Sequence, residues 1–218
     1  MPSPAASPAE PGHDCPLCPR LVAYREANRA AHPDWFNGPV PSFGDENARL
    51  LIVGLAPGVQ GANRTGRPFT GDFAGDLLYS TLHEFGFSKG KFDARADDGL
   101  QLVDTIISNA VRCVPPQNKP TPLEAKTCQQ FLIGRFAALP NLKAVLALGR
   151  IAHESVIAAH DLRKTKFAFG HQTSHDIGEG VRLFDSYHCS RYNTNTRRLT
   201  PEMFHAVFRD IRAYLDKA

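Results

Sequence analysis

Short apolar runs alternate with segments of helical periodicity along this chain. Four runs have the length and composition of buried strands: LLIVGL (50–55), DTIISNAVRC (104–113), KAVLALG (143–149) and VRLFDSYH (181–188). Four segments with helical spacing follow them: 75–87, 121–139, 150–160 and 200–218. Because continuous apolar strands are typical of parallel sheets covered on both faces, the alternation predicts an α/β fold. We expect a single domain with a mainly parallel central sheet flanked by helices.

Two of the expected helices have clear starting points. Thr121 is followed by Pro122 and Glu124, which gives a capping box with proline at the first helical position. Thr200 and Pro201 give the last helix the same Thr-Pro start. These signals indicate that both helices start directly after loops.

The length and composition favour one globular domain. The chain has 218 residues, of which 42% are hydrophobic, and this is enough for one substantial core. The opening MPSPAASPAEPG is rich in proline, alanine and serine, so we expect a disordered tail at 1–11 and the folded domain at 12–218. No apolar run approaches the roughly 20 residues that cross a bilayer, and the start does not resemble a secretion signal, so no membrane association is expected. The net charge of +3 suits a polyanionic partner.

Three unusual loops follow the expected strands, at 54–72, 113–120 and 188–198. In parallel α/β sheets, ligands bind beyond the carboxyl ends of the strands, where such loops meet. The topology therefore predicts that the three loops form one cleft.

The first loop, GLAPGVQGANRTGRPFTGD (54–72), carries five glycines and ends on Asp72. Two of the glycines have the spacing of a phosphate-binding loop, but Arg67 and Pro68 stand where that motif has lysine and serine or threonine, which argues against a nucleoside triphosphatase. Glycines let the backbone approach a ligand closely, and long loops in compact domains are usually functional. Phe69 offers a stacking face. Asp72 can cap the next helix or serve chemistry, and spacing alone leaves both roles open.

Four of the five cysteines form a candidate metal site. Cys15 and Cys18 make a CxxC pair, whose thiolates can clamp a metal. Cys113 ends the second expected strand, and Cys128 lies on the helix after it. The four together suit zinc or an iron–sulfur cluster, although the second pair could instead be small buried hydrophobic residues. Cys189 is interpreted as a packing residue.

The last loop, HCSRYNTNTRRLT (188–200), concentrates hydroxyl, amide, aromatic and guanidinium groups. Such groups contact phosphates and bases in proteins that bind nucleic acids. A solvated polar loop that ends at the cap Thr200 is the alternative. The three arginines here, together with Arg64 and Arg67 in the first loop, favour a polyanion at the expected cleft.

Four segments together resemble the uracil-DNA glycosylase superfamily, specifically the family 5 (type B) enzymes of bacteria and archaea. They are GLAPG (54–58), NRTGRPFTGD (63–72), NAVRCVPPQNKPT (109–121) and HCSRYNTNTRRLT (188–200). The cysteines at 15, 18, 113 and 128 fit the same family, and the resemblance covers almost the whole chain after the tail. It implies a uracil-DNA glycosylase-like fold, a [4Fe–4S] cluster held by the four cysteines, and hydrolysis of the N-glycosidic bonds of damaged bases.

The resemblance also implies roles for individual residues. Asp72, Asn118 and His188 match positions to which the family's catalysis is attributed. Leu55 stands where related families carry an acidic residue. No carboxylate can act from that position, so the resemblance implies that other residues carry out catalysis. Asn109 stands where family 4 has a base-reading asparagine, and some family 5 members lack an amide there. The residues implied to bind substrate are Gly54, Leu55, Ala56, Pro57, Gly58, Phe69, Asn109, Arg191 and Asn195.

The implied function is a monofunctional glycosylase that removes uracil, and deaminated purines such as hypoxanthine and xanthine, from duplex DNA. The base is rotated out of the helix, and an abasic site is left for base excision repair. The implied setting is a monomer in the cytoplasm of a bacterium or archaeon, associated with the nucleoid, with abasic-site repair enzymes as candidate partners. The alternative is a non-catalytic nucleic-acid-binding protein with a structural metal site. Asp72 argues against it, because a binding module needs no carboxylate facing an anionic ligand.

Overall fold

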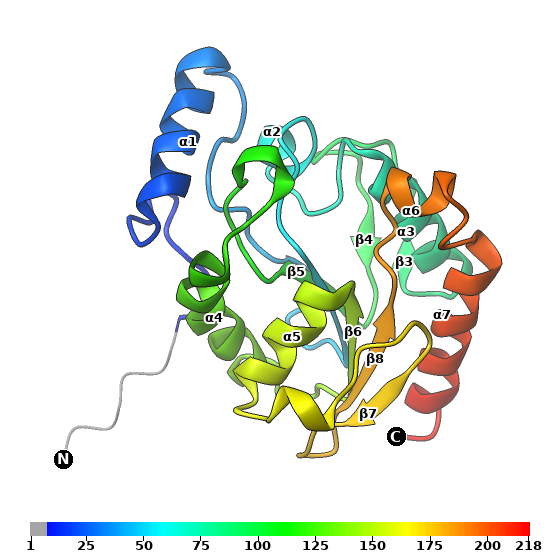
Figure 1. Ribbon diagram of the computed structural model, residues 1–218. Coiled ribbons are helices and arrows are strands. Elements are labelled where there is room, and N and C mark those ends of the chain that lie inside the picture. The colour runs from blue at the N-terminus through cyan, green and yellow to red at the C-terminus, as the bar shows by residue number, and fades with distance from the viewer. Residues whose placement is uncertain (1–7) are drawn as a thin grey trace.

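Within residues 8–218, which the computed structural model describes, a six-stranded sheet forms the centre of the molecule (Figure 1). Its strand order is β1-β5-β2-β6-β8-β7. The four inner strands are parallel: β2 (Leu50–Gly54), β5 (Thr105–Asn109), β6 (Ala144–Leu148) and β8 (Arg182–Ser186). The two short edge strands are antiparallel to their neighbours: β1 (Phe43–Gly44) and β7 (Ser174–Asp176). The expected α/β fold with a mainly parallel sheet is confirmed.

The inner strands are buried because helices cover both faces of the sheet. Every residue of β2, β5 and β6 is buried. Side chains alternate between the faces, so Ile52 packs with one layer of helices and Leu51 with the other. The register pairs Gly54 with Asn109 at the carboxyl ends of β2 and β5. These strands therefore end together, which brings the loops that follow them to one edge of the sheet.

Two pairs of helices form the layers (Figure 1). One face is covered by α3 (Phe73–Glu84) and α7 (Pro201–Leu215), and the other by α4 (Pro122–Ala137) and α5 (Arg150–Ala159). A fifth helix, α1 (Pro19–Ala31), lies to one side of these layers, where Leu21 packs with Val111 and Phe131. The four helices of the layers correspond to those expected from the sequence.

The capping residues behave as the sequence predicts. The Thr121 hydroxyl accepts a hydrogen bond from the N–H of Glu124 at 3.2 Å, and the Glu124 carboxylate accepts one from the N–H of Thr121 at 2.7 Å. The Thr200 hydroxyl accepts one from the N–H of Met203 at 3.3 Å. Because these bonds satisfy free N–H groups at the helix ends, α4 and α7 begin one residue after their caps.

The structure also contains elements that the sequence did not predict. They are α1, β1, β7, the two-stranded sheet of β3 (Ser88–Lys89) and β4 (Gln101–Leu102), the short helices α2 (Ala62–Thr65) and α6 (Arg191–Asn195), and the 3-10 turns Pro116–Asn118 and Lys164–Lys166. Apart from α1, each is too short for its periodicity to be visible in the sequence. The strands expected at 104–113 and 181–188 are shorter than predicted, because the chain already turns into loops after Asn109 and Ser186.

Two of the last residues of the expected tail, Ala9 and Glu10, pack against the folded domain. Residues 1–7 of that tail lie outside the described residues. The Glu10 carboxylate accepts a hydrogen bond from Arg112 at 2.6 Å and also pairs with Arg135. Arg112 donates a further hydrogen bond to the carbonyl of Ala9 at 3.0 Å. Since both arginines are buried, Glu10 supplies a counter-charge that they need. Ala9 and Glu10, which precede the expected start of the domain at residue 12, therefore contact buried residues of that domain.

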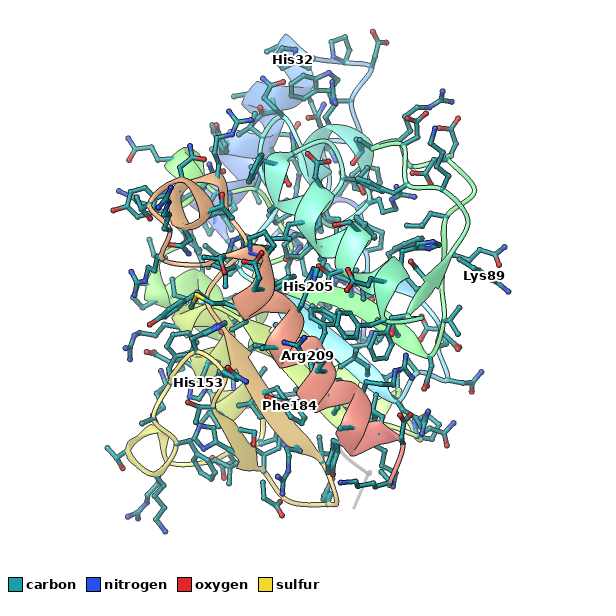
Figure 2. All side chains as sticks on the ribbon, turned by 90° about the vertical axis from the view of Figure 1, so that its right-hand side faces the viewer. His32, Lys89, His153, Phe184, His205 and Arg209 are labelled. Atoms are coloured by element: carbon teal, nitrogen blue, oxygen red, sulfur yellow. The ribbon has the colours of Figure 1, made fainter. Side chains whose placement is uncertain are left out.

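The last helix, α7, is amphipathic, as expected. Its apolar side packs on β8, where the rings of Phe184 and Tyr214 have centroids 5.7 Å apart. Figure 2 shows Phe184 on the strand beside α7, and His205 and Arg209 on the helix itself. None of the helices within residues 8–218 has the length and apolar character that crossing a bilayer requires.

Candidate active site

The loops after β2, β5 and β8 border one cleft at the carboxyl edge of the sheet, as predicted. The cleft has a volume of about 950 Å³. Seven of the predicted site residues line it: Leu55, Ala56, Gly58, Asp72, Asn118, His188 and Arg191. The residues that follow β6 border the same cleft, so all four parallel strands contribute to it.

Asp72 lies at the start of α3 and faces the cleft. Its Oδ1 accepts a hydrogen bond from the N–H of Gly75 at 3.2 Å, so the residue caps the helix. Its Oδ2 lies close to Gly61, where a Cβ would come within 2.6 Å of it. Burial raises the pKa of the Asp72 carboxyl above its ordinary value, although hydrogen bonds from backbone N–H groups oppose the shift. The two roles that the sequence left open, helix cap and cleft group, are therefore combined in one residue.

His188 follows β8 and lines the same cleft. Its Nδ1 atom is buried and makes no hydrogen bond to any residue in 8–218. The ring lies among protein atoms while an edge of the residue reaches the cleft, and this burial lowers the pKa of His188 to about 4. The imidazole is therefore neutral at neutral pH, with one nitrogen that donates a hydrogen bond and one that accepts.

Three predicted substrate-binding residues lie behind the cleft lining. Phe69 is 7% exposed, and its ring stacks on that of His188 with centroids 5.9 Å apart. Asn109 is 3% exposed, and its Oδ1 lies where a Cβ on Gly54 would approach it to 2.4 Å. Phe69 therefore supports His188 from behind, whereas the sequence predicted a face exposed to the ligand.

Two further predicted residues lie apart from the lining. Pro57 is buried in the first loop, and Asn195 is exposed at the end of α6. Arg191, at the start of that helix, does line the cleft, and its guanidinium lies 5.3 Å from the centre of the Phe73 ring. The short helix α6, which the sequence did not predict, carries Asn195 away from the cleft.

Asn118 sits in a strained turn that opens toward the cleft. Gln117 and Asn118 both have φ values of 56°, in the left-handed region that non-glycine residues rarely adopt. Arg20 of α1 holds the turn from outside, because it donates to the carbonyl of Lys119 at 3.1 Å and pairs with Glu124 at 2.7 Å. Tertiary contacts therefore fix the conformation that brings Asn118 to the cleft.

The four predicted metal-ligating cysteines meet at a separate place. Cys15, Cys18, Cys113 and Cys128 line one small cavity of about 20 Å³ among apolar side chains. All four are free thiols, and the N–H of Arg112 donates to Sγ of Cys128 at 3.4 Å. Within the described chain, no three of these sulfurs lie within 4.8 Å of one another. Cysteines that are far apart in the sequence therefore line one cavity.

A second group of potential metal ligands, His153, His175 and Asp185, is explained by hydrogen bonds. The His153 Nδ1 lies 2.8 Å from Asp185, and its Nε2 lies 3.0 Å from the carbonyl of Phe167. Burial works against the charged form of His153, but the hydrogen bond and charge of Asp185 outweigh it and raise the pKa of the ring above its ordinary value. The His175 Nε2 donates to the carbonyl of Ala168 at 3.1 Å. The bond to Asp185 joins α5, where Figure 2 labels His153, to β8.

Comparison with known proteins identifies the family. The family model described as "Uracil DNA glycosylase superfamily" matches residues 41–212. The chain belongs to this superfamily. It is 47% identical to a type-5 uracil-DNA glycosylase of Thermus thermophilus, over 91% of this chain and 92% of that protein. Type-5 enzymes of Mycobacterium bovis and Pyrobaculum aerophilum are 42% and 40% identical, over 91% and 90% of this chain and 77% and 87% of theirs.

These matches confirm the resemblance that the four sequence segments carry. The chain is a DNA glycosylase, a hydrolase of N-glycosyl bonds, and it acts on DNA. The comparisons therefore favour the enzyme over the non-catalytic binding protein.

The cleft of this glycosylase also contains residues that the sequence analysis missed. Four cationic side chains line it: Lys119, Arg150, Arg191 and Arg198. The arginines of the last loop, Arg191 and Arg198 among them, were predicted to lie at the cleft, whereas Lys119 and Arg150 were not. Arg150 comes directly after β6, so the rule that ligands bind at the carboxyl ends of parallel strands would have found it. The loop after β6 was overlooked because it is short and has no cluster of polar residues.

The structure corrects the expectation that Arg67 is available to a polyanion. Its side chain is 4% exposed and pairs with Asp98 at 2.7 Å, and it does not reach the cleft. Arg64 is exposed but lies outside the cleft lining. The positive charge of the glycosylase cleft therefore comes from the loops after β5, β6 and β8 rather than from the glycine-rich loop.

Proposed function

We propose that this DNA glycosylase hydrolyses the N-glycosidic bond of uracil that has been rotated out of duplex DNA, and leaves an abasic site. One observation carries the proposal: Asp72 and the neutral ring of His188 line the same cleft, at the carboxyl edge of the sheet. The glycosidic bond of a stacked base is out of reach, so the nucleotide must enter the cleft from the helix. A cleft of about 950 Å³ is large enough for one nucleotide.

In the proposed reaction the bond between C1′ and the base nitrogen breaks, and the base leaves with the bonding electrons. Water adds to C1′, and its proton passes to the base or to solvent. The carboxylate of Asp72 stabilises positive charge on the sugar and orients the attacking water. The neutral His188 donates a hydrogen bond to an oxygen of the departing base, where negative charge develops. The side-chain amide of Asn118 donates a second hydrogen bond to the departing base.

We propose a substrate range wider than uracil. Leu55 and Ala56 give the cleft an apolar wall, and Gly58 adds no side chain to it. An apolar pocket discriminates weakly between bases of similar shape, by about 1–3 kcal/mol per missing contact. Hypoxanthine and xanthine are therefore proposed substrates.

The four cationic side chains of the cleft are proposed to hold the DNA. Lys119, Arg150, Arg191 and Arg198 come from three different loops. Contacts from such residues to phosphates position a duplex without reading its sequence. Asn195, exposed on the outer side of α6, is proposed to contact the strand that flanks the flipped nucleotide.

We propose that Cys15, Cys18, Cys113 and Cys128 hold a [4Fe–4S] cluster. Four thiolates are the complete ligand set for such a cluster. The four cysteines line one cavity among apolar side chains, which supports a shared site. When bound, the cluster supplies a covalent cross-link between the N-terminal segment, the loop after β5 and α4.

The biological setting is part of the proposal. The monofunctional reaction ends at an abasic site, so enzymes that cleave abasic DNA are the proposed partners. We propose that the protein works as a monomer in the cytoplasm, at the nucleoid of a bacterium or archaeon. The relatives named above come from bacteria and an archaeon.

One assay tests this function. Duplexes with a single uracil, hypoxanthine or xanthine are incubated with the protein, and half of each sample is then treated with alkali, which cleaves abasic sites. We expect strand cleavage at each lesion after alkali only, and none in an undamaged duplex. Intact uracil strands after alkali would contradict the glycosylase function. Rejection of both purines would contradict the wide range, and cleavage without alkali would contradict the monofunctional reaction.

A further inference from the structure

The buried guanidinium of Arg67 is held at every nitrogen. It forms two parallel hydrogen bonds with the Asp98 carboxylate, at 2.8 and 2.7 Å, and its Nε donates to the Thr70 hydroxyl at 2.8 Å. The Arg67 side chain is 4% exposed and that of Asp98 is 1% exposed. A two-pronged pair of this kind fixes both distance and orientation, and it does so away from competing water.

Asp98 is held equally firmly on its own side. Its two oxygens also accept hydrogen bonds from the N–H groups of Asp93 and Leu100, at 2.9 and 3.0 Å. Hydrogen bonds from Arg67 hold the pKa of this carboxyl well below its usual range. Asp98 lies in the connection between β3 and β4, which borders no part of the cleft. The pair therefore ties that connection to the glycine-rich loop, 31 residues away in the sequence.

Aromatic rings enclose the same guanidinium. The centroids of Phe43, Tyr79 and Phe92 lie 5.0, 5.5 and 5.6 Å from it. The Tyr79 hydroxyl donates to the carbonyl of Pro68 at 2.7 Å, which fixes the residue next to Arg67. Arg67 is thus built into the core of the domain and cannot turn outward to a phosphate without breaking these contacts.

The segment that this clamp holds is strained and leads to the cleft. Phe69 has a φ of 52°, and Gly71 has a φ of 87°. A Cβ on Gly75 would lie 1.9 Å from the carbonyl oxygen of Phe69, so α3 is packed directly against the strained residue. Strained backbone persists only where its surroundings over-determine it. The strained stretch carries the Phe69 ring that supports His188, and it ends at Asp72.

We propose that Arg67 and Asp98 are positioning residues for the glycosylase reaction. The pair holds residues 67–72 in the conformation that places the Asp72 carboxylate at the cleft and the Phe69 ring behind His188. Arg67 therefore serves the reaction without touching DNA. This inference rests on the proposed role of Asp72 in bond cleavage.

The test compares two neighbouring carboxylates in the full-length protein. Asp98→Asn keeps the shape of the side chain but removes the charge and one acceptor of the buried pair. Asp97→Asn is the matched control, because Asp97 pairs with Arg95 at 2.8 Å on the open surface, with both side chains more than half exposed. Single-turnover excision of uracil gives the rate, and binding of an uncleaved duplex over a range of salt gives the affinity and its salt slope.

We expect Asp98→Asn to lower the excision rate about tenfold to a hundredfold, since small displacements of reacting groups cost rates of this order. Duplex affinity and its salt slope should stay as in the wild type, and Asp97→Asn should change nothing. An unchanged excision rate in Asp98→Asn would overturn the inference. A salt slope lowered by about one in Arg67→Gln, which removes the positive charge, would also overturn it, because Arg67 would then be a phosphate contact.

A double-variant cycle shows whether the pair acts through Asp72. In an Asp72→Asn background, Asp98→Asn should cause a smaller loss than in the wild type, because one of the groups that it positions is already disabled. The same factor of loss in both backgrounds would overturn the link to Asp72. If Asp72→Asn alone leaves the rate intact, the proposed function fails and the link to Asp72 fails with it. If Asp98→Asn does not fold, Arg67→Lys, which keeps the buried charge without the two-pronged geometry, replaces it with the same expectations.

Discussion

Gly54 leaves the space that the Asn109 side chain occupies: a Cβ on Gly54 would lie 2.4 Å from the Oδ1 of Asn109. The two residues are paired at the carboxyl ends of β2 and β5. The same Cβ would lie 2.6 Å from the ring of Phe69. Both neighbours therefore require glycine at position 54. Phe69 supports His188, and Asn109 ends β5.

Gly54→Ala should disturb both neighbours at once. We expect excision to fall about tenfold or more, because displaced groups in a reacting geometry are costly. The crowding should also lower the free energy of unfolding by about 1–3 kcal/mol. Gly12→Ala is the control, since a Cβ there would meet no atom within 4 Å. Single-turnover rates and thermal unfolding of both variants test this. Equal behaviour of the two variants would contradict the explanation.

The activity should be insensitive to pH through the neutral range. Burial lowers the pKa of His188 to about 4, so the ring stays neutral down to about pH 5. Acid protonates both His188 and Asp72, whose pKa is raised by burial, and both changes remove the forms that the reaction uses. We expect a flat single-turnover rate between about pH 6 and about pH 8, and a steep fall below about pH 5. A midpoint near pH 6.5 that disappears in His188→Gln would contradict the buried neutral ring.

The same shift makes a prediction about stability. The unfolded chain binds a proton at His188 with an ordinary pKa of about 6.5, while the folded chain binds it only near pH 4. Between these values the unfolded state holds more protons, so this residue makes stability rise with pH. His188→Gln should flatten that part of the stability profile, measured by denaturant unfolding from about pH 4.5 to about pH 7. An identical profile in the two proteins would contradict it.

The cysteine site should contain iron. Protein purified without oxygen should be yellow-brown and hold about four iron and four sulfide ions per chain. Cys128→Ser should lose the iron, whereas Cys189→Ser should keep it, because the Cys189 thiol instead contacts the carbonyl of Ala74 at 3.5 Å. Metal and sulfide analysis of the three proteins decides this. A colourless protein with one zinc ion per chain would contradict the cluster but leave the four-cysteine site.

Binding to undamaged duplex should weaken as salt rises, since phosphate contacts release counterions. Arg191→Ala should weaken binding to all sequences alike and lower the salt slope by about one. Arg209→Ala is the control, because Arg209 is exposed on α7 and does not line the cleft (Figure 2). Affinity titrations between about 50 mM and about 200 mM salt measure both. Equal losses in the two variants would contradict a localised DNA face.

Local signals in the sequence predicted much of the fold. The buried strands are readable because runs such as LLIVGL are apolar on both faces, and the start of α4 is readable because Thr121 and Glu124 cap each other. The convergence of Asp72 and His188 follows from one rule about the carboxyl ends of parallel strands.

The remaining features depend on contacts between distant segments. Asp98 could not be paired with Arg67 from the sequence, since nothing local links two loops 31 residues apart. The turn at Asn118 depends on Arg20, which lies on a different helix. Glu10 was placed in a disordered tail because its partners, two buried arginines, are known only from the packing.

The most direct test of the account is single-turnover excision of uracil by Asp72→Asn beside the wild type. Asparagine caps helices as well as aspartate does, so the hydrogen bond to the N–H of Gly75 and the fold should survive while the charge is lost. We predict an unchanged melting temperature and a rate lower by about a hundredfold or more, on uracil, hypoxanthine and xanthine alike. A wild-type rate in Asp72→Asn on any of the three would contradict the role of this carboxylate in the cleft.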